Sequence, residues 1–403
     1  MGPRKVAMWL QIAAAVIVST GCRMASEPAD PGSSHRQRSR PRADAPRPLE
    51  HQASPLPDHP PIRFHSACTL EGTRGHHFSS VTFSPDGKLL AAGRKPGLDP
   101  SDVTVWDWRN RKLLRVLSAG GRHEYVSVIA FLPAGDRLVT GSSDCNTVML
   151  WDVAGGTLLD TLAVPGRWDV GVTSAAAFPD GGRVVCCDWT ALIELDLNSR
   201  TQKFLTPGGG ASPTDGDKQQ PDRSYFGSVQ FTADGSRFAT TIVHGNESRG
   251  VLVWDAKSCR VVRRIKAPLE EPGFAFSPDG ARVAAVCYDE GPGNSAVRVW
   301  DTSSGKLLLA GRVFDEGTFD LSFTPDHKYL FVCGLTDYWK KPEAKTAVGV
   351  WDATTGKLVN RLATAGRALS LAMSPDGKFL AVPGRDIEIY SIEYVSPSRA
   401  TGN

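Results

Sequence analysis

The side chains that could carry chemistry in this sequence begin with aspartates that recur at nearly regular spacing. Most lie in a Pro-Asp-Gly turn or a close variant of it, and the set is Asp86, Asp180, Asp234, Asp279, Asp326 and Asp376. General acid–base catalysis needs one or two positioned carboxylates, not six equal copies. Aspartate in a turn also bonds its own backbone two residues further on. We interpret these carboxylates as turn formers and predict no catalytic residue.

Motifs for nucleophilic, phosphate or metal chemistry do not occur in the sequence. There is no Gly-x-Ser-x-Gly elbow, and the closest approach to a phosphate loop, within 208–218, has the wrong spacing and no Ser or Thr after its lysine. No Cys-x-x-Cys pair exists, so we predict no metal site and no cofactor. Cys187, Cys287 and Cys333 end matching strands and are predicted to be small buried side chains.

A third group of side chains suits binding. Aromatic residues gather in the expected connections, and arginine follows glycine just before several strands, as in Gly311-Arg312. Trp, Tyr and Arg dominate binding hot spots, and a guanidinium pairs with carboxylates. The candidate binding residues are Arg122, Arg167, Trp168, Trp189, Tyr225, Tyr288, Arg312, Tyr338, Trp339 and Arg367. The alternative is that these arginines form exposed ion pairs with acids such as Glu124 and Asp169, worth about 0–1 kcal/mol each.

An element that repeats seven times must position these residues. Its turn follows Phe83, Phe131, Phe178, Phe231, Phe276, Phe323 and Met373, at steps of 45 to 53 residues. Five copies carry a Trp-Asp pair 20 to 28 residues after that position, whereas the third and seventh have Leu195-Asp196 and Tyr390-Ser391. Each copy fits four short strands. Units of this period cannot bury their apolar faces alone and therefore stack on one another.

On these turns and Trp-Asp pairs, the sequence resembles the WD-repeat β-propeller family over roughly residues 62–393. The resemblance implies an all-β fold, a seven-bladed β-propeller of four-stranded antiparallel blades around a channel. The Gly-His of the family is largely missing. The second copy alone offers a hydrogen-bonding set, formed by His123, Thr140 or Ser142, Asp144 and Trp151. The other blades are expected to hold by packing.

The last copy ends after three strands, near Tyr390. Residues 62–70 resemble the outer strands of other copies, such as 112–117. An N-terminal strand that completes the C-terminal blade would leave no open edge between the first and last blades. We therefore predict that the last blade is closed by this N-terminal strand.

The first 22 residues are predicted to be an export signal, since Arg4 and Lys5 precede an apolar stretch of 15 residues. Residues 19–22 resemble the lipobox of bacterial lipoproteins, which implies a lipidated Cys22 and a membrane-anchored protein of the cell envelope or periplasm. Ser19 departs from the aliphatic residue typical there, so an unlipidated signal and a chance apolar start stay open. Residues 23–61 hold nine Pro and six Arg and predict a disordered tether, and 394–403 form a tail.

Charge and loop length bound the function. Beyond residue 61 the chain has 38 basic and 38 acidic residues, so net charge gives no support for a nucleic-acid partner. The connections after second strands vary in length and share one face of a propeller, where scaffolds usually bind. We predict a monomeric, non-enzymatic platform for a protein or peptide partner. The alternative is a small-ligand-binding or substrate-processing propeller with its site over the channel mouth.

Overall fold

The structure is a computed structural model. It describes residues 56–57, 60–72, 77–95, 102–118, 126–142, 145–164, 171–188, 191–205, 226–242, 250–288, 295–312, 314, 317–335, 346–365 and 370–395. By internal contacts the chain divides into two units, Met1–Ala53 and Ser54–Asn403, and all described residues lie in the second. Within them every regular element is a β-strand, and 28 strands form seven antiparallel sheets of four strands each.

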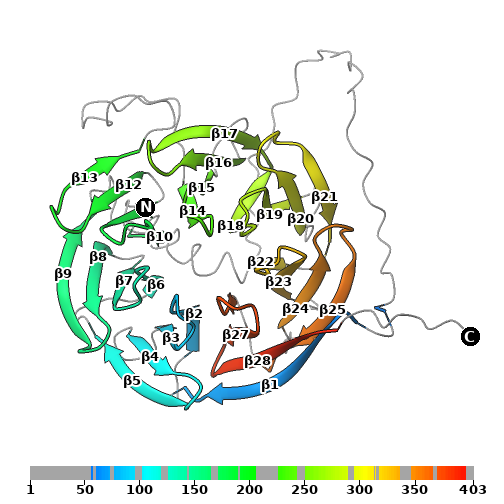
Figure 1. Ribbon diagram of the computed structural model, residues 1–403, viewed down its shortest axis with the longest axis horizontal. Helices are drawn as coiled ribbons and strands as arrows, with labels where there is room; N and C mark the ends of the chain where they lie inside the picture. The colour runs from blue at the N-terminus through cyan, green and yellow to red at the C-terminus, as the bar shows by residue number, and fades with distance from the viewer. Residues whose placement is uncertain are drawn as a thin grey trace, which may run out of the picture. The chain divides into compact units, whose positions relative to one another are not determined.

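The seven sheets are the blades of a ring (Figure 1). Their first strands, nearest the axis, are β2 (His77–Phe83), β6 (Val126–Phe131), β10 (Ser174–Ala177), β14 (Phe226–Phe231), β18 (Leu269–Phe276), β22 (Gly317–Phe323) and β26 (Ala372–Met373). The second strands are β3 (Leu89–Lys95), β7 (Arg137–Ser142), β11 (Arg183–Cys187), β15 (Arg237–Ile242), β19 (Arg282–Tyr288), β23 (Tyr329–Leu335) and β27 (Phe379–Pro383).

The third strands are β4 (Val103–Asp107), β8 (Cys145–Asp152), β12 (Leu192–Asp196), β16 (Gly250–Asp255), β20 (Ser295–Asp301), β24 (Thr346–Asp352) and β28 (Ile387–Tyr394). The fourth, outermost strands are β5 (Lys112–Leu117), β9 (Thr157–Ala163), β13 (Gln202–Phe204), β17 (Arg260–Lys266), β21 (Leu307–Gly311) and β25 (Leu358–Ala363), with β1 (Ile62–Leu70) in the seventh blade. The predicted all-β, seven-bladed propeller is confirmed.

The N-terminal strand closes the ring as predicted. The seventh sheet has the order β1-β28-β27-β26, and β1 runs antiparallel to β28 from Ile62 opposite Tyr394 to Leu70 opposite Ile387. Figure 1 shows the blue first strand beside the red last one. Pairing the two ends of the ring removes the open edge that an incomplete blade would present.

The hydrophobic core is divided into seven clusters, one between each pair of adjacent blades. Each blade therefore buries its apolar faces only against its neighbours, as the repeat spacing predicted. The predicted fillers Cys187, Cys287 and Cys333 are buried free thiols within these clusters. Burial raises the pKa of Cys187 and Cys333 well above the usual range of a thiol.

The recurring aspartates are turn formers, as predicted. The Asp86 carboxylate accepts hydrogen bonds from Ser84 Oγ at 2.7 Å and the Lys88 backbone N–H at 3.0 Å. Asp180, Asp234, Asp279, Asp326 and Asp376 bond the backbone N–H two residues on in the same way. These bonds hold the pKa of Asp86 and Asp234 below the usual value, because they favour the carboxylate.

The expected side-chain set of the second blade is present as far as it is described. Trp151 Nε1 donates to Thr140 Oγ1 at 2.9 Å, whereas His123 and Asp144 lie outside the described residues. The expectation that the other blades hold by packing alone is wrong for the fourth, where Trp254 Nε1 donates to Thr240 Oγ1 at 3.0 Å. Both threonines occupy the fourth position of their second strand, and each indole lies two residues beyond the threonine's own pairing partner on the third strand.

Candidate interaction surface

The two ends of the ring differ in how their connections vary. Five residues join the first strand to the second in every blade, as 84–88 do between β2 and β3, and four or five join third to fourth strands. At the opposite end, the connection from second to third strand ranges from two residues (143–144) to ten (336–345). We call these the turn end and the loop end. The turns keep nearly constant lengths, whereas the connections at the loop end differ from blade to blade. In rigid scaffolds such variable connections usually carry the binding residues.

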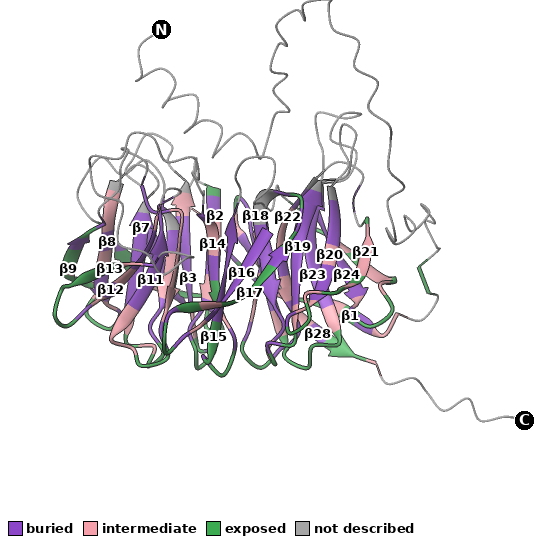
Figure 2. Ribbon diagram, turned by 90° about the horizontal axis from the view of Figure 1, so that it is seen from above, coloured by how far each residue is buried: buried purple, intermediate pink, exposed green. Residues whose placement is uncertain are grey.

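At the turn end, turns of neighbouring blades pack against one another. Gly135, Gly181 and Gly87 pack against the turn proline of the preceding blade, respectively Pro85, Pro133 and Pro375. These glycines have φ of +67° to +77°, a region that side chains disfavour, so the turn sequence is set by the backbone. Figure 2 shows these exposed turns side by side along one rim.

Most of the predicted binding residues lie outside the described residues. These are Arg122, Arg167, Trp168, Trp189, Tyr225, Tyr338, Trp339 and Arg367. Tyr288 is the last residue of β19, paired with Ser295 at the loop end, and its side chain is not among those described. Their gathering on one face therefore stays a prediction, as does the competing interpretation of exposed ion pairs.

Arg312 is described, and the reason for its position is local. It is exposed and directly follows β21, whose last residue, Gly311, faces the indole of Trp351 in the next blade. A Cβ at Gly311 would lie 2.7 Å from a ring carbon of Trp351, so only glycine lets the indole pack there. The packing of Trp351 against Gly311 thus fixes the end of β21, and Arg312 follows directly at the loop end.

An ion pair that the sequence did not reveal lies at the loop end of blade 1. Arg94 Nη1 is 3.6 Å from Asp102 Oδ2, and the Arg94 backbone N–H donates to the Asp102 carbonyl at 2.9 Å. The two side chains are only 13% and 16% exposed. Pairing of an arginine and an aspartate across the connection is the signal that could have found it. The pair holds the ends of β3 and β4 together at the loop end.

A second missed residue, Asp320 of β22, joins blades 6 and 7. Its Oδ2 accepts hydrogen bonds from the Leu371 backbone N–H at 3.0 Å and from Ser370 Oγ at 2.9 Å, and its Oδ1 accepts from the Leu321 N–H at 2.9 Å. Burial raises the pKa of Asp320, and the three hydrogen bonds act in the opposite direction. The hydrogen bonds of this carboxylate therefore link blade 6 to blade 7. We call such a line of polar contacts between neighbouring blades a seam.

Other inner seams use the same device with neutral side chains. Ser174 Oγ accepts from the Val229 backbone N–H at 3.1 Å between blades 3 and 4. Gln230 Oε1 accepts from the Phe276 N–H at 2.8 Å between blades 4 and 5. Side-chain acceptors on one inner strand thus bind donors on the next, and these bonds make the frame of the ring rigid.

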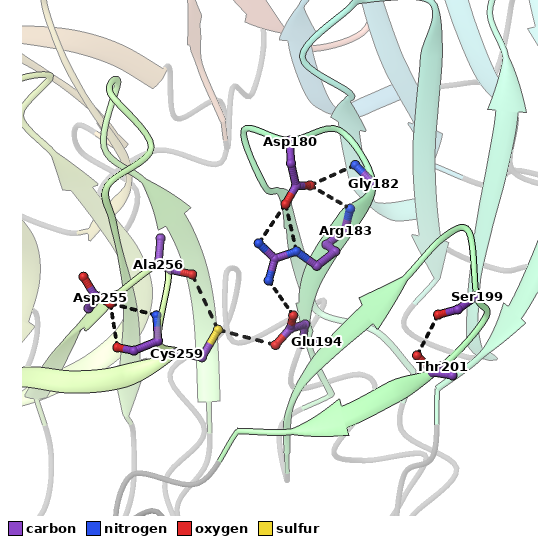
Figure 3. Close-up of polar contacts among 10 residues, drawn as sticks. Asp180, Gly182, Arg183, Glu194, Ser199, Thr201, Asp255, Ala256 and Cys259 are labelled. Atoms are coloured by element: carbon purple, nitrogen blue, oxygen red, sulfur yellow. Dashed lines mark hydrogen bonds and ion pairs between the residues drawn. The ribbon is translucent and has the colours of Figure 1, made fainter.

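A polar cluster at the turn end spans blades 3 and 4 (Figure 3). Arg183 donates from Nη1 to Glu194 Oε1 at 2.7 Å, and its other nitrogens bond Asp180 Oδ2. Cys259 Sγ, on the next blade, lies 3.4 Å from Glu194 Oε2 and donates to it. Burial and then the Glu194 charge raise the pKa of Cys259 to about 11. Every polar group in this cluster has a partner inside it, so the cluster is a structural seam.

Among the described residues no group of three or more His, Cys, Asp or Glu side chains could hold a metal ion. Within that same part, no helix has the length and apolar character needed to cross a membrane.

Comparison with known sequences agrees with this architecture. The WD domain, G-beta repeat family matches residues 66–107 and 111–152. The chain carries WD40 repeats. It is 25% identical over 332 residues to periodic tryptophan protein 2 of Arabidopsis thaliana, covering 78% of this chain and 33% of that protein. It is also 31% identical over 111 residues to an uncharacterized WD repeat-containing protein of Synechocystis sp., covering 27% and 29% of the two chains.

A third relative is small ribosomal subunit protein RACK1 of Glycine max, at 27% identity over 126 residues, or 30% of this chain and 36% of that protein. The chain spans about a third or less of the length of the first curated relatives it matches. The WD40 repeats are out of phase with the blades. Residues 66–107 run from β1 of the last blade through β4 of the first, so each repeat begins with the outer strand of the preceding blade. This offset is why the first repeat must complete the last blade.

Proposed function

We propose that this WD40-repeat propeller is a non-enzymatic protein-interaction platform that holds a protein or peptide partner at its loop end. The observation that carries the proposal is the contrast between the two ends: seven first turns of identical length, and loop-end connections of two to ten residues. Hydrogen bonds between neighbouring blades stabilise the ring, so the loop-end connections start and end at fixed positions. Rigid presentation lowers the entropy that binding would otherwise cost.

The described inner strands support capture in preference to catalysis. Their described side chains are mostly small, hydroxyl-bearing or apolar, such as Ser79, Thr82 and Ala175, and the one histidine described on these strands, His77, is exposed at the start of β2. The described carboxylate of these strands, Asp320, is buried and bonded within a seam. A proton-transfer group would need access to a substrate.

The partner we propose is an acidic peptide or another carboxylate-bearing segment. Arg122, Arg167, Arg312 and Arg367 follow glycine at equivalent points of four repeats, and Trp168, Trp189 and Trp339 supply apolar anchors. Guanidinium groups bind carboxylates in bidentate geometry, and indoles fill hot-spot pockets. Arg312 is exposed directly after β21, and this exposure supports its availability to a partner.

We further propose that the protein is exported and anchored to the membrane of a bacterial cell envelope through lipid on Cys22. The basic start, the apolar stretch and the small residues before Cys22 support this proposal. A single anchor of this kind would place the ring outside the cytoplasm, and residues 23–61 would act as its tether.

The test compares two triple variants by quantitative affinity purification of the full chain. Arg122→Ala/Arg167→Ala/Trp189→Ala should reduce the captured partner at least tenfold, about 1.4 kcal/mol, with an unchanged melting temperature. The matched control at the turn end, Lys88→Ala/Lys328→Ala/Lys378→Ala, should capture as much as the unaltered chain. Loss with the turn-end variant alone would overturn the choice of surface. A captured small molecule in place of a protein would favour the ligand-binding alternative.

A further inference from the structure

The outer strand of blade 4 carries more positive charge than any other outer strand of the ring. β17 reads RVVRRIK, with Arg260, Arg263, Arg264 and Lys266, and Lys257 lies in the turn before it. No acidic residue occurs between Ala256 and Leu269. The other six outer strands hold at most two Lys or Arg each. Because basic and acidic residues balance beyond residue 61, this strip is a local departure from a neutral ring.

These cations are exposed to solvent. Within the described part of the chain, Lys257, Arg260, Arg263 and Lys266 form no ion pair. Arg115 of β5 provides the contrast, because its Nε donates to the Ala154 carbonyl of the next blade at 2.8 Å. The charge on β17 is therefore available to a partner.

An exposed apolar side chain lies among the charges. Val262 is 51% exposed, the highest value among the exposed large hydrophobic residues of the described chain. It lies at a bulge, where the register of β17 against β16 shifts. The bulge places the extra side chain, Val262, on the outside of the strand. A partner that binds along β17 could therefore contact this apolar side chain and the neighbouring cations together.

The shape of the strip favours a linear partner. β17 is the outermost strand of its sheet (Figure 1), so among the described residues one of its backbone edges has no neighbouring strand. At about 3.3 Å per residue, Arg260 to Lys266 spans about 20 Å. The outer strands on either side, β13 and β21, hold one cation and none, so among the described outer strands the concentration of positive charge is confined to β17. A membrane or a duplex would meet a broader surface.

We propose that β17 captures an acidic, extended segment of a partner protein, which adds to blade 4 as a fifth strand. Backbone hydrogen bonds along the free edge provide affinity, the cations select acidic side chains, and Val262 contacts an apolar residue between them. This surface is on the outer rim and is separate from the loop end. Its failure and that of the proposed function are therefore distinguishable.

The competing explanation is that the charges protect a free edge from pairing with other copies of the chain, a common role of basic residues on edge strands. Anionic lipid and nucleic acid are further occupants that cations alone would attract. A requirement for free backbone amide groups on the ligand distinguishes strand addition from edge protection, lipid binding and nucleic-acid binding, because only an added strand needs them.

The experiment measures fluorescence anisotropy of the full chain with a labelled ten-residue peptide of alternating Glu and Val. We expect binding that weakens at least tenfold in Arg260→Gln/Arg263→Gln/Lys266→Gln, and also when alternate peptide nitrogens are methylated. The matched control Lys112→Gln/Lys306→Gln/Lys357→Gln, which removes the same charge from three other blades, should bind normally. The loop-end triple variant should also bind normally. The reversal Arg260→Glu/Arg263→Glu/Lys266→Glu should select a Lys-Val peptide instead.

Four results would overturn the proposal. Equal binding of the methylated peptide would show charge attraction without strand addition, and equal binding by the glutamine variant would remove the strip from the interaction. Binding of phosphatidylserine vesicles or a single-stranded oligonucleotide through these residues, without peptide binding, would assign another occupant. Self-association of the glutamine variant in light scattering, without peptide binding by the unaltered chain, would assign the strip to edge protection.

Discussion

Ile62 and Asn360 tie the beginning of the described chain to the blade before the last. Asn360 Nδ2, on β25, donates a hydrogen bond of 2.6 Å to the Ile62 carbonyl oxygen, while Ile62 pairs with Tyr394 of β28. The Ile62 side chain is fully buried among residues of blades 6 and 7. One residue of β1 therefore joins both blades at the closure of the ring.

Removing β1 should open the ring. A chain lacking residues 1–72 loses the buried side chains of Ile62 and Leu70, worth about 1.5–3 kcal/mol each, and exposes the edge of β28. We expect a large fall in melting temperature or aggregation, measured by circular dichroism and light scattering. A chain lacking residues 1–55 is the matched control and should melt normally. Equal melting curves for the two deletions would contradict closure by β1.

Removing a threonine acceptor from an indole N–H should destabilise the protein, and supplying one where it is missing should stabilise it. Thr140→Val removes the acceptor of Trp151 Nε1 and should destabilise the protein by about 1–3 kcal/mol, because a buried donor is left unpaired. In blade 6, Val332 occupies the corresponding position and Trp351 Nε1 has no partner among the described residues. Val332→Thr should therefore stabilise, or cost far less than a buried Val→Thr change elsewhere, such as Val286→Thr. Denaturant unfolding measures both, and equal losses at 332 and 286 would refute the pairing.

Asp320 should make the seam between blades 6 and 7 depend on pH. Its pKa is raised by burial, so the folded state binds a proton more tightly than the unfolded state, and its contribution to stability falls as pH rises through the folded pKa. Asp320→Ala leaves the Leu371 N–H without its acceptor and should cost about 1–3 kcal/mol. The cost should be larger below the ordinary Asp pKa of 3.8 than at pH 8, measured by urea unfolding. A cost that grows toward pH 8 would contradict this sign.

Cys259 should react slowly with alkylating agents. Its pKa of about 11 leaves little thiolate at neutral pH, and Glu194 contributes to that shift after burial. The thiol form is favoured in the folded state, so stability should be lost as pH rises from about 9 to about 11. Glu194→Gln should speed iodoacetamide labelling of Cys259 at pH 8, followed by peptide mass spectrometry. Faster labelling of Cys333, which is remote from Glu194, would show general loosening instead.

Lipidation at Cys22 is tested in a bacterial host. Cys22→Ser should release the protein from membranes after carbonate washing, because the thiol that would carry the lipid is absent. Ser19→Leu, which restores the aliphatic residue typical of a lipobox, should leave anchoring intact or increase it. Continued membrane partition of the serine variant would count against a lipid on Cys22.

Local patterns were enough to predict the ring. The Pro-Asp-Gly turns and Trp-Asp pairs repeat within single units, and their geometry depends on residues close in sequence, such as Asp86 and Lys88. Closure by residues 62–70 could also be predicted, because a missing fourth strand and a spare strand at the other end of the chain are both visible in the sequence. Buried cysteines followed from their position at the ends of second strands.

The contacts between blades were decided only by the tertiary structure. Glu194 meets Cys259 from 65 positions away, and Asp320 meets Leu371 from 51. Nothing in the local sequence distinguishes these side chains from exposed polar residues. The stacking angle and register of neighbouring blades set which residues meet. The sequence alone therefore determined the fold class, the number of blades and the strand that closes them, because these depend on repeated local geometry. The hydrogen bonds between blades depend on which repeats become neighbours, and the cationic outer edge of blade 4 depends on which strand edges stay open.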